Sequence, residues 1–282
     1  MPLSEFSGFM IMNKRLIIDL DNTLFPCTRY YVDPVLNLME YIVNKRNDSN
    51  KNKCLHQIQI LKNEVTKQGN DVKHVDEMLE YSDSEPLLKQ IAKEQVKIDV
   101  KLVDEFKKQK QGFCAARFPY SFLFTFKEFC QKSSFSDRME VYNIGQEFMN
   151  IKPGLYEGVK ETLDFLIQQN DSLVLLTKGD YNLQNKKIQI NKLNKWFKEI
   201  CIVDDKLPET FEELAGGYNR KDIYSIGDTI GSEINSALKA GFKAIHIPQQ
   251  IWRYDEGAEI IEPEKTLIFK SFKDIKTNYY LL

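Results

Sequence analysis

The stretch RLIIDLDNTLF, residues 15–25, decides the fold. Residues 16–18 form a continuous apolar run, which indicates a strand buried on both faces of a sheet. Asp19 and Asp21 follow at the carboxyl end of this strand, the edge at which open α/β sheets bind ligands. Side chains two residues apart in an extended chain point the same way, so these carboxylates would crowd negative charge that a cation or a proton must relieve.

Strands alternate with helices from about residue 150 onward. Further apolar strands are predicted at SLVLLT (172–177), EICIVDD (199–205), KDIYSIGD (221–228) and FKAIHIP (242–248). Helical periodicity separates them, and the first of these helices is predicted from residue 152, with Pro153 at its start. Alternation of this kind predicts a parallel sheet with right-handed crossovers.

Residues 31–140 show only helical patterns. The first helix there is predicted to begin with Asp33 as its N-cap and Pro34 at its first position. Residues 113–135 are rich in aromatic side chains, which would form either a packed core or a pocket wall. The predicted fold class is α/β, with a Rossmann-like parallel sheet core (1–30 and 141–282) and an inserted all-helical domain (31–140). Because the insertion starts beside the two aspartates, it would form a lid over them.

Composition excludes several classes of protein. The 282 residues are 42% hydrophobic and 28% charged, the balance of a soluble globular chain, and the formal net charge of −2 offers no basic field to a nucleic acid polymer. No apolar run approaches the ~20 residues that cross a membrane, and the amino terminus reverses the charge order of a secretory signal. Five cysteines without a CxxC pair favour reduced thiols in the cytoplasm. The expected partner is a small molecule, with a monomer and a homodimer both open.

Further polar residues follow the other predicted strands. Thr177 ends one strand, Lys206 follows the next, and Asp228 ends a third. With Asp19 and Asp21 they would line one edge of one sheet, a set that chance rarely assembles.

This set favours phosphoryl transfer. Asp19 and Asp228 offer the hard oxygens that Mg²⁺ prefers, Asp19 would attack phosphorus, and Asp21 would exchange the proton of the leaving oxygen and of the attacking water. Thr177 would hold the phosphoryl oxygens, and Lys206 would neutralise their charge.

The motifs DLDNT (19–23), LLTKGD (175–180), Lys206 and IGDTIGSE (226–233) resemble, in this order, the four motifs of the haloacid dehalogenase-like hydrolase superfamily. The resemblance implies a Rossmann-like core and a C1-type helical cap after the first motif. It also implies that Asp19 is the nucleophile, that Asp21 is the acid and base, and that Mg²⁺ is the cofactor. The sequence departs from the family pattern at Glu233, where the fourth motif usually ends in aspartate.

The resulting site prediction contains three sets of residues. The catalytic residues are Asp19 and Asp21, the phosphate-binding residues are Thr177, Lys178 and Lys206, and the metal ligands are Asp19, Asp21 and Asp228. Lys178 and Lys187 are alternatives to Lys206 for the third motif, and a metal role for Glu233 stays open against a role in complementing a helix dipole.

The predicted function is a magnesium-dependent phosphatase that acts on a small phosphomonoester, a nucleotide or a sugar phosphate, through an aspartyl-phosphate. Dehalogenation is disfavoured, because the family's dehalogenases resemble the same first motif without the second aspartate. A phosphomutase with the same nucleophile and a catalytically silent binding protein remain alternatives. Aromatic residues of segment 113–135, Phe118 among them, would stack on a base or sugar if they did not form core.

Overall fold

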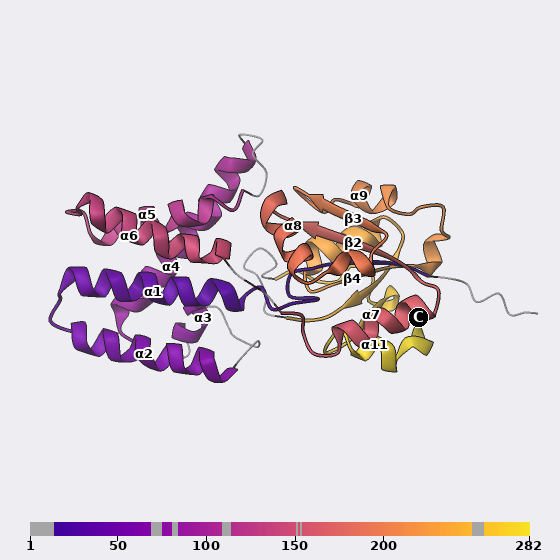
Figure 1. Cartoon of the computed structure of the whole chain (residues 1–282), viewed down its shortest axis with the longest axis horizontal. Helices are drawn as coiled ribbons and strands as arrows, with labels where there is room; N and C mark the ends of the chain where they lie inside the picture. Colours follow the sequence, from indigo (N-terminus) through magenta and orange to yellow (C-terminus); the bar gives the residue numbers. More distant parts are fainter. Residues whose placement is uncertain are drawn as a thin grey trace, which may run out of the picture.

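The computed structural model describes residues 14–68, 75–80, 84–108, 114–150, 152, 154–249 and 257–282. The short arm expected at the amino terminus lies outside these residues, as does Pro153. The chain divides visibly into a helical part, which runs from indigo to magenta, and a part built on a sheet (Figure 1). None of the helices in the described ranges combines the length and apolarity of a membrane crossing.

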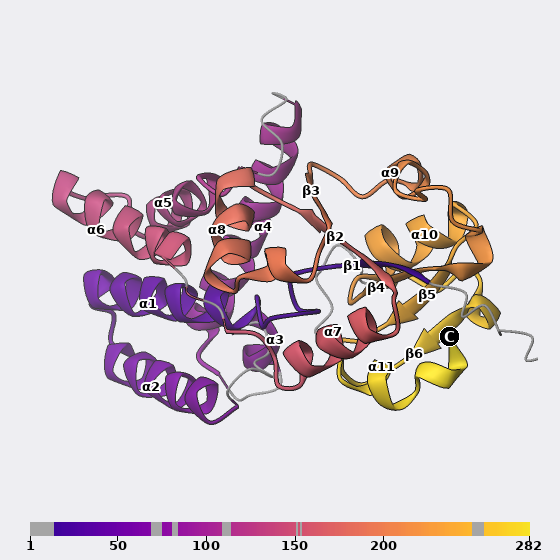
Figure 2. The ribbon, with the colours of Figure 1, turned by 45° about the vertical axis from the view of Figure 1, so that its right-hand side comes forward.

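Six parallel strands form one sheet in the order β3-β2-β1-β4-β5-β6. The strands are β1 (Arg15–Ile18), β2 (Ser172–Lys178), β3 (Glu199–Val203), β4 (Ile223–Gly227), β5 (Lys243–His246) and β6 (Thr266–Ile268). In register, Arg15 of β1 faces Ser172 of β2 on one side and Ile223 of β4 on the other. The first strand of the chain therefore lies inside the sheet, between strands that follow it by more than half the sequence (Figure 2).

The apolar run of β1 is buried on both faces, as its composition predicts. Leu16 and Ile18 join the apolar cluster beneath α7 (Val159–Gln168) and α11 (Asp274–Thr277). Ile17 points to the opposite face and packs in the cluster that includes Phe211 of α9 (Pro208–Glu213) and Ala237 of α10 (Ser236–Lys239). Helices on both faces of a parallel sheet confirm the α/β class.

The remaining helices of the sheet part are α8 (Tyr181–Ile190) and several short turns of helix. These turns are η2 (Leu193–Lys195), η3 (Arg220–Asp222), the π-helical η4 (Ile230–Asn235), η6 (Pro263–Lys265) and η7 (Tyr279–Leu281). Helix α7 begins at Val159 after Gly158, whose φ of +78° suits glycine, so the helix starts later than predicted from residue 152. Strand β6 was not predicted, because three residues carry too little periodicity.

Segment 29–150 contains helices and no strand among its described residues. It contains α1 (Arg29–Arg46), α2 (Lys51–Gln68), α3 (Val75–Glu80), α4 (Pro86–Lys108), α5 (Arg117–Phe129), α6 (Phe135–Gln146) and η1 (Glu147–Asn150). These helices enclose an apolar cluster of their own. Leu183 of α8, in the sheet part, also belongs to this cluster. The helices occupy 29–150, a slightly longer span than the predicted 31–140.

Helix α1 begins at Arg29, so the prediction of an N-cap at Asp33 is wrong. Pro34 lies inside the helix, where its missing N–H removes a single backbone bond near the amino-terminal end. The earlier start has a local cause. The side-chain oxygen of Asn22 accepts hydrogen bonds from the backbone N–H groups of Cys27 and Thr28, which fixes the chain just before the helix.

Candidate active site

The loop after β1 carries the first two aspartates into the site. The backbone N–H of Asp19 donates to the carbonyl of Ile226 at 2.9 Å, which extends the ladder with β4 by one residue. The chain then turns at Asn22, a non-glycine residue with φ of +61°. Asn22 is buried, and its amide nitrogen lies 3.4 Å from a carboxylate oxygen of Asp228. The turn is thus tied to the strand end of β4.

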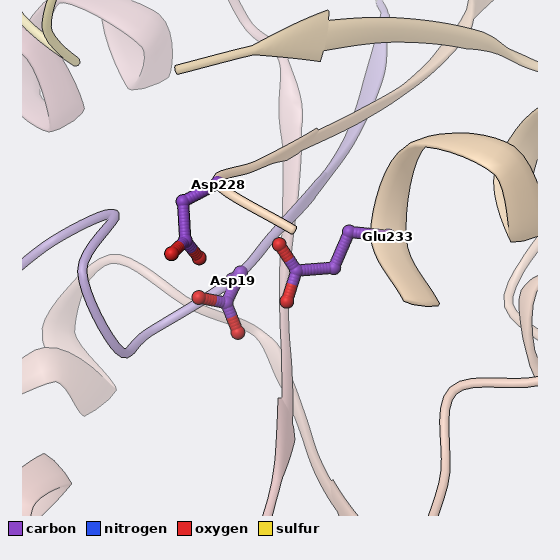
Figure 3. A group of neighbouring side chains, drawn as sticks. All are labelled: Asp19, Asp228 and Glu233. Carbon is purple, nitrogen blue, oxygen red and sulfur yellow. The ribbon is translucent and has the colours of Figure 1, made fainter. Parts of the chain in front are cut away.

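Three carboxylates converge at the carboxyl ends of β1 and β4. One oxygen of each of Asp19, Asp228 and Glu233 lies within 4.8 Å of the others (Figure 3). Glu233 comes from the π-helical segment after β4, and its Oε2 accepts a hydrogen bond from the Thr229 N–H at 3.0 Å. A Cβ at Gly227 would lie 2.0 Å from this oxygen, so glycine is required for Glu233 to reach the cluster.

Lys206 neutralises part of this charge. Its Nζ donates to Asp19 and, at 2.6 Å, to Glu233, and the lysine side chain is almost fully buried. Burial by itself would lower the pKa of Lys206, but the two carboxylates raise it above its ordinary value. One cation faces three acids, so the cluster keeps an excess of negative charge.

Burial and the excess negative charge raise the pKa values of Asp19 and Asp228, the two aspartates at strand ends. Burial and the charge of Glu233 raise the pKa of Asp19 from its ordinary 3.8 to about 8. Burial, Glu233 and Asp19 likewise raise the pKa of Asp228 well above its ordinary value. Asp19 Oδ2 is closed to solvent and accepts no hydrogen bond within the described part of the chain. Hard oxygens in this arrangement suit a divalent cation of the magnesium type.

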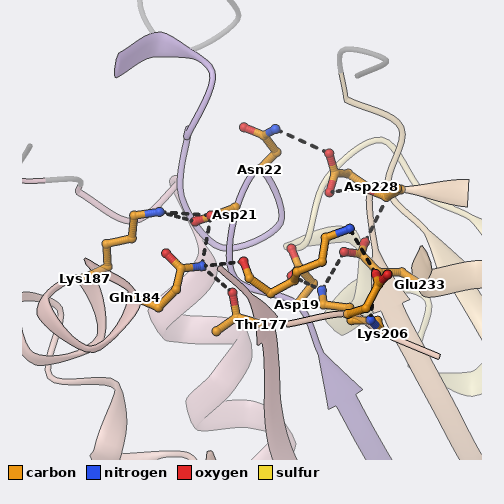
Figure 4. Close-up of polar contacts among 12 residues, drawn as sticks. Asp19, Asp21, Asn22, Thr177, Gln184, Lys187, Lys206, Asp228 and Glu233 are labelled. Atoms are coloured by element: carbon orange, nitrogen blue, oxygen red, sulfur yellow. Dashed lines mark hydrogen bonds and ion pairs between the residues drawn. The ribbon is translucent and has the colours of Figure 1, made fainter. Parts of the chain in front are cut away.

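Asp21 lies apart from that cluster and is held by α8. Lys187 Nζ lies 3.0 and 2.9 Å from the two carboxylate oxygens of Asp21, and Gln184 Nε2 donates to Asp21 Oδ2 at 3.1 Å (Figure 4). The same Gln184 nitrogen lies 2.6 Å from Thr177 Oγ1. Gln184 and Lys187 are both buried, whereas the Asp21 side chain is 26% exposed. Asp21 and Thr177 are therefore fixed relative to each other by one helix.

The structure brings the predicted site residues to a single sheet edge but distributes them differently. Glu233, whose metal role stayed open, belongs to the carboxylate cluster, whereas the carboxylate of Asp21, a predicted metal ligand, is paired with Lys187. Lys206 and Lys187 were alternatives for the third motif. In the structure Lys206 contacts Asp19 and Glu233, whereas Lys187 contacts Asp21. Lys178 also faces the cavity, with its Nζ 3.4 Å from Asp205 Oδ1.

Two residues of the site, Gln184 and Asn22, were not assigned a role from the sequence. Gln184 stands seven residues after Thr177, one turn into α8, where its N-cap Asp180 orients the helix. The available signal was the helical spacing of Asp180, Gln184 and Lys187, which places all three near one face. Asn22 follows Asp21 directly, and its positive φ is a conformation that asparagine tolerates better than most residues.

A cavity of about 520 Å³ joins these groups to the helical segment. Its catalytic end contains Asp19, Asp21, Thr177, Lys206, Asp228 and Glu233. Its other walls come from α1, α3, α4, the start of α5 and η1. The volume is that of a small-molecule site, in the range of about 300–1,000 Å³.

Comparison with known proteins gives one family match. The model of the family described as "Haloacid dehalogenase-like hydrolase" matches residues 118–247. The matched segment contains Thr177, Lys206, Asp228 and Glu233, but it begins after the strand that carries the first two aspartates. No curated protein sequence matches the chain.

Several solved structures share the fold over nearly the whole chain. A haloacid dehalogenase-like family hydrolase from Xanthomonas campestris is 18% identical, with 96% of each chain covered and a TM-score of 0.63. A HAD-hydrolase from Bacillus subtilis, bound to magnesium, is 15% identical, with 96% of this chain and 99% of that chain covered and a TM-score of 0.54. The L-2-haloacid dehalogenase from Xanthobacter autotrophicus is 10% identical, with 95% and 99% covered and a TM-score of 0.52.

Identities this low are evidence for the fold and leave the reaction open, since hydrolases and a dehalogenase share it. The expectation from the motifs nevertheless agrees with the family match and with the topology. Residues 118–247 of this chain are therefore similar to the haloacid dehalogenase-like hydrolases, and the chain shares its fold with the solved structures named above.

Proposed function

We propose that this protein is a magnesium-dependent phosphatase that hydrolyses a small phosphomonoester through an aspartyl-phosphate on Asp19. The observation that carries the proposal is the position of Asp21. Its carboxylate is held by Lys187 and Gln184 beside Thr177, at the same cavity end as Asp19. A reaction that displaces an alkoxide needs a proton donor there, whereas one that displaces a halide does not.

The carboxylates of Asp19, Asp228 and Glu233 would hold the magnesium ion. Its fit rests on three oxygens within 4.8 Å and on the buried Asp19 Oδ2 without a hydrogen bond. When bound, the ion would supply positive charge that keeps Asp19 ionised and reduces its repulsion from the substrate phosphate.

The side chains would then divide the reaction between them. Asp19 forms a bond to phosphorus while the bond to the leaving oxygen breaks, and Asp21 gives that oxygen a proton. Asp21 later removes a proton from the water that cleaves the aspartyl-phosphate, which regenerates Asp19 and releases phosphate. Thr177 and Lys206 bind the phosphoryl oxygens, with Lys206 balancing their developing charge.

We propose that the helices at 29–150 act as a cap over this site. The backbone N–H of Ala115 donates to Asp180 Oδ2 at 3.3 Å, and Lys186 Nζ donates to the carbonyl of Met149 at 2.8 Å. These contacts connect the cap to α8 and to its N-cap residue. A covered cavity favours a small ester over a phosphoprotein. The five free cysteines also fit a reducing compartment such as the cytoplasm.

The test is release of phosphate from p-nitrophenyl phosphate by the purified protein, with and without Mg²⁺, alongside Asp19→Asn. Magnesium-dependent turnover that the substitution abolishes would support the proposal. Turnover that survives in Asp19→Asn would refute the mechanism. Phosphate exchange between esters that a bisphosphate accelerates, without net release, would favour the phosphomutase alternative. Absence of both reactions would favour a binding protein.

A further inference from the structure

The cap end of the cavity has a composition opposite to that of the catalytic end. Helix α4 presents one stripe to the cavity at helical spacing, made of Ala92, Gln95, Val96, Asp99, Val100 and Val103, and the exposed Asp104 lines the cavity next to it. Four of these seven side chains are apolar. Two of the polar groups, Gln95 and Asp99, stand one turn apart on the same face.

An ion pair lies within this mostly apolar wall. Arg117, at the start of α5, donates from its guanidinium to Asp99 Oδ2 at 3.2 Å. The side chains of Arg117 and Asp99 are 7% and 15% exposed, so the pair is largely withdrawn from solvent. Gln95 is buried beside them and donates from Nε2 to Ser121 Oγ at 3.3 Å. Acceptors and donors are thus concentrated at one place on the wall.

Aromatic rings line the cavity beside this pair. Tyr31, Phe118 and Phe148 all face it. The rings of Tyr31 and Phe148 stack with their centroids 4.1 Å apart, and Phe118 packs against both at 5.2 Å. Burial raises the pKa of Tyr31, Cys27, Asp21 and Asp99 raise it further, and Arg117 lowers it, so the tyrosine lies near the charges of both cavity ends.

The composition of these walls would favour some leaving groups of a phosphate ester over others. A sugar carries hydroxyls around its whole ring, and most of them would face valines and aromatic carbons without a hydrogen bond, which is unfavourable. A flat ring with apolar faces can contact such walls, and a single edge of mixed donors and acceptors can meet a carboxylate, a guanidinium and a carboxamide. Nucleobases have both properties.

We propose that the substrate is a nucleoside monophosphate, whose base lies against the aromatic rings and is recognised at its edge by Gln95, Asp99 and Arg117. This inference rests on the proposed phosphatase function and specifies its substrate class. The sequence alone left nucleotides and sugar phosphates equal. The polar groups of α4 and α5 distinguish them.

The experiment compares kcat/KM for nucleoside 5′-monophosphates, glucose 6-phosphate and p-nitrophenyl phosphate in wild type and in Asp99→Asn. Glu105→Gln is the matched control, because it removes the same charge from an exposed position of α4. In wild type we expect at least one nucleotide to exceed glucose 6-phosphate by about tenfold or more. Asp99→Asn should lower kcat/KM for that nucleotide by about tenfold and change kcat/KM for p-nitrophenyl phosphate by less than about twofold, because the p-nitrophenyl group has no hydrogen-bond donor for the Asp99 carboxylate.

Melting curves would reveal whether Asp99→Asn misfolds, and a second variant tests the same wall independently. Val96→Thr keeps the side-chain shape and adds a hydroxyl to the apolar wall, so it should narrow the preference for nucleotide over sugar phosphate. Equal wild-type rates for the two esters would overturn the inference and leave the phosphatase function intact, as would equal losses in Asp99→Asn and Glu105→Gln. If wild type hydrolyses none of the esters, the proposed function itself fails.

Discussion

The two ends of the cavity are built by different means. At the catalytic end, side chains at or just after four strand ends and on α8 and η4 place three clustered carboxylates with Lys206, and beside them Asp21 with Lys187. At the cap end, one helix stripe and the start of α5 place an ion pair among valines and aromatic rings, and the carboxylates of Glu77 and Asp104 also line the wall. The first end is a buried cluster of charges, whereas the wall of the second end is mostly apolar.

On the proposed function, this difference assigns the phosphoryl transfer to one end of the cavity and the recognition of the leaving group to the other. Strand ends of a parallel sheet are fixed by backbone ladders, which gives the precision that bond-making requires. A helical wall can exchange side chains at i, i+3 and i+4 without moving the sheet, so it can adjust which leaving group enters. Four substitutions or titrations test this division, from the largest expected effect to the smallest.

Asp19→Asn should produce the largest change, because it removes the proposed nucleophile. We expect kcat for p-nitrophenyl phosphate to fall by about 10³-fold or more. The same variant should be more stable than wild type at pH 7 without metal, because the wild-type fold must keep a proton on Asp19 that the unfolded chain releases, and asparagine carries no such cost. Loss of both activity and stability would mean that Asp19 is structural, and the contrast between the two ends would disappear.

Lys187→Met should lower kcat by about 10²-fold through Asp21, the size expected when an acid-base group loses its positioning. KM should change less, because Thr177 and Lys206 still bind the phosphate. Lys160→Met, an exposed lysine of α7, is the control. Rescue by Lys187→Arg, which retains the charge, would support positioning. A change confined to KM would instead assign Lys187 to substrate binding.

The catalytic end should make stability depend on pH and metal. The folded pKa of Asp19 is about 8, so the fold retains a proton that the unfolded chain releases near pH 4. In EDTA the free energy of unfolding should therefore decrease as pH rises from about 4 to about 8. Mg²⁺ favours the ionised carboxylates and should raise Tm most at pH 8, by several degrees. Asp228→Asn should reduce that rise, and a Tm independent of pH would contradict the charge excess.

Val100→Ala at the cap end should have the smallest effect. It removes two methyl groups from the wall, so kcat/KM should fall less than about tenfold for a nucleotide and remain unchanged for p-nitrophenyl phosphate. The control is Lys101→Ala, an exposed neighbour on α4. An equal loss of kcat/KM for both esters would show that α4 influences the chemical step, and the proposed division of roles between the two ends would be wrong.

The sequence predicted the catalytic end better than the cap end for a physical reason. Asp19, Thr177 and Asp228 each follow a short apolar run, and parallel strands bring all such ends to one edge whatever the details of packing. The partners on α8 depend on how that helix rotates against the sheet, which no local pattern fixes. The same limit applied to Arg117 and Asp99, since their contact requires α4 and α5 to be packed together.

Helix starts were less predictable than strand ends. The Asp33 and Pro34 pair resembles a helix start, yet α1 begins at Arg29 because Asn22 binds the preceding backbone from across the turn. The aromatic segment was ambiguous for a related reason. Phe118 and Phe122 are both buried in the cluster of the helical segment, but only Phe118 also lines the cavity, and the rotation of α5 decides which of them does so.

The inner position of β1 also affects how the chain is made. Arg15 and Ser172, neighbours in the sheet, are 157 residues apart, and Ile223 on the other side is later still. During synthesis from the amino terminus, β1 leaves the ribosome first and has no strand to pair with until most of the protein exists. The cap helices have mostly local contacts and can form meanwhile. We expect a nascent chain that ends before β2 to contain a folded helical segment and an unpaired apolar strand, which makes it a candidate for chaperone binding.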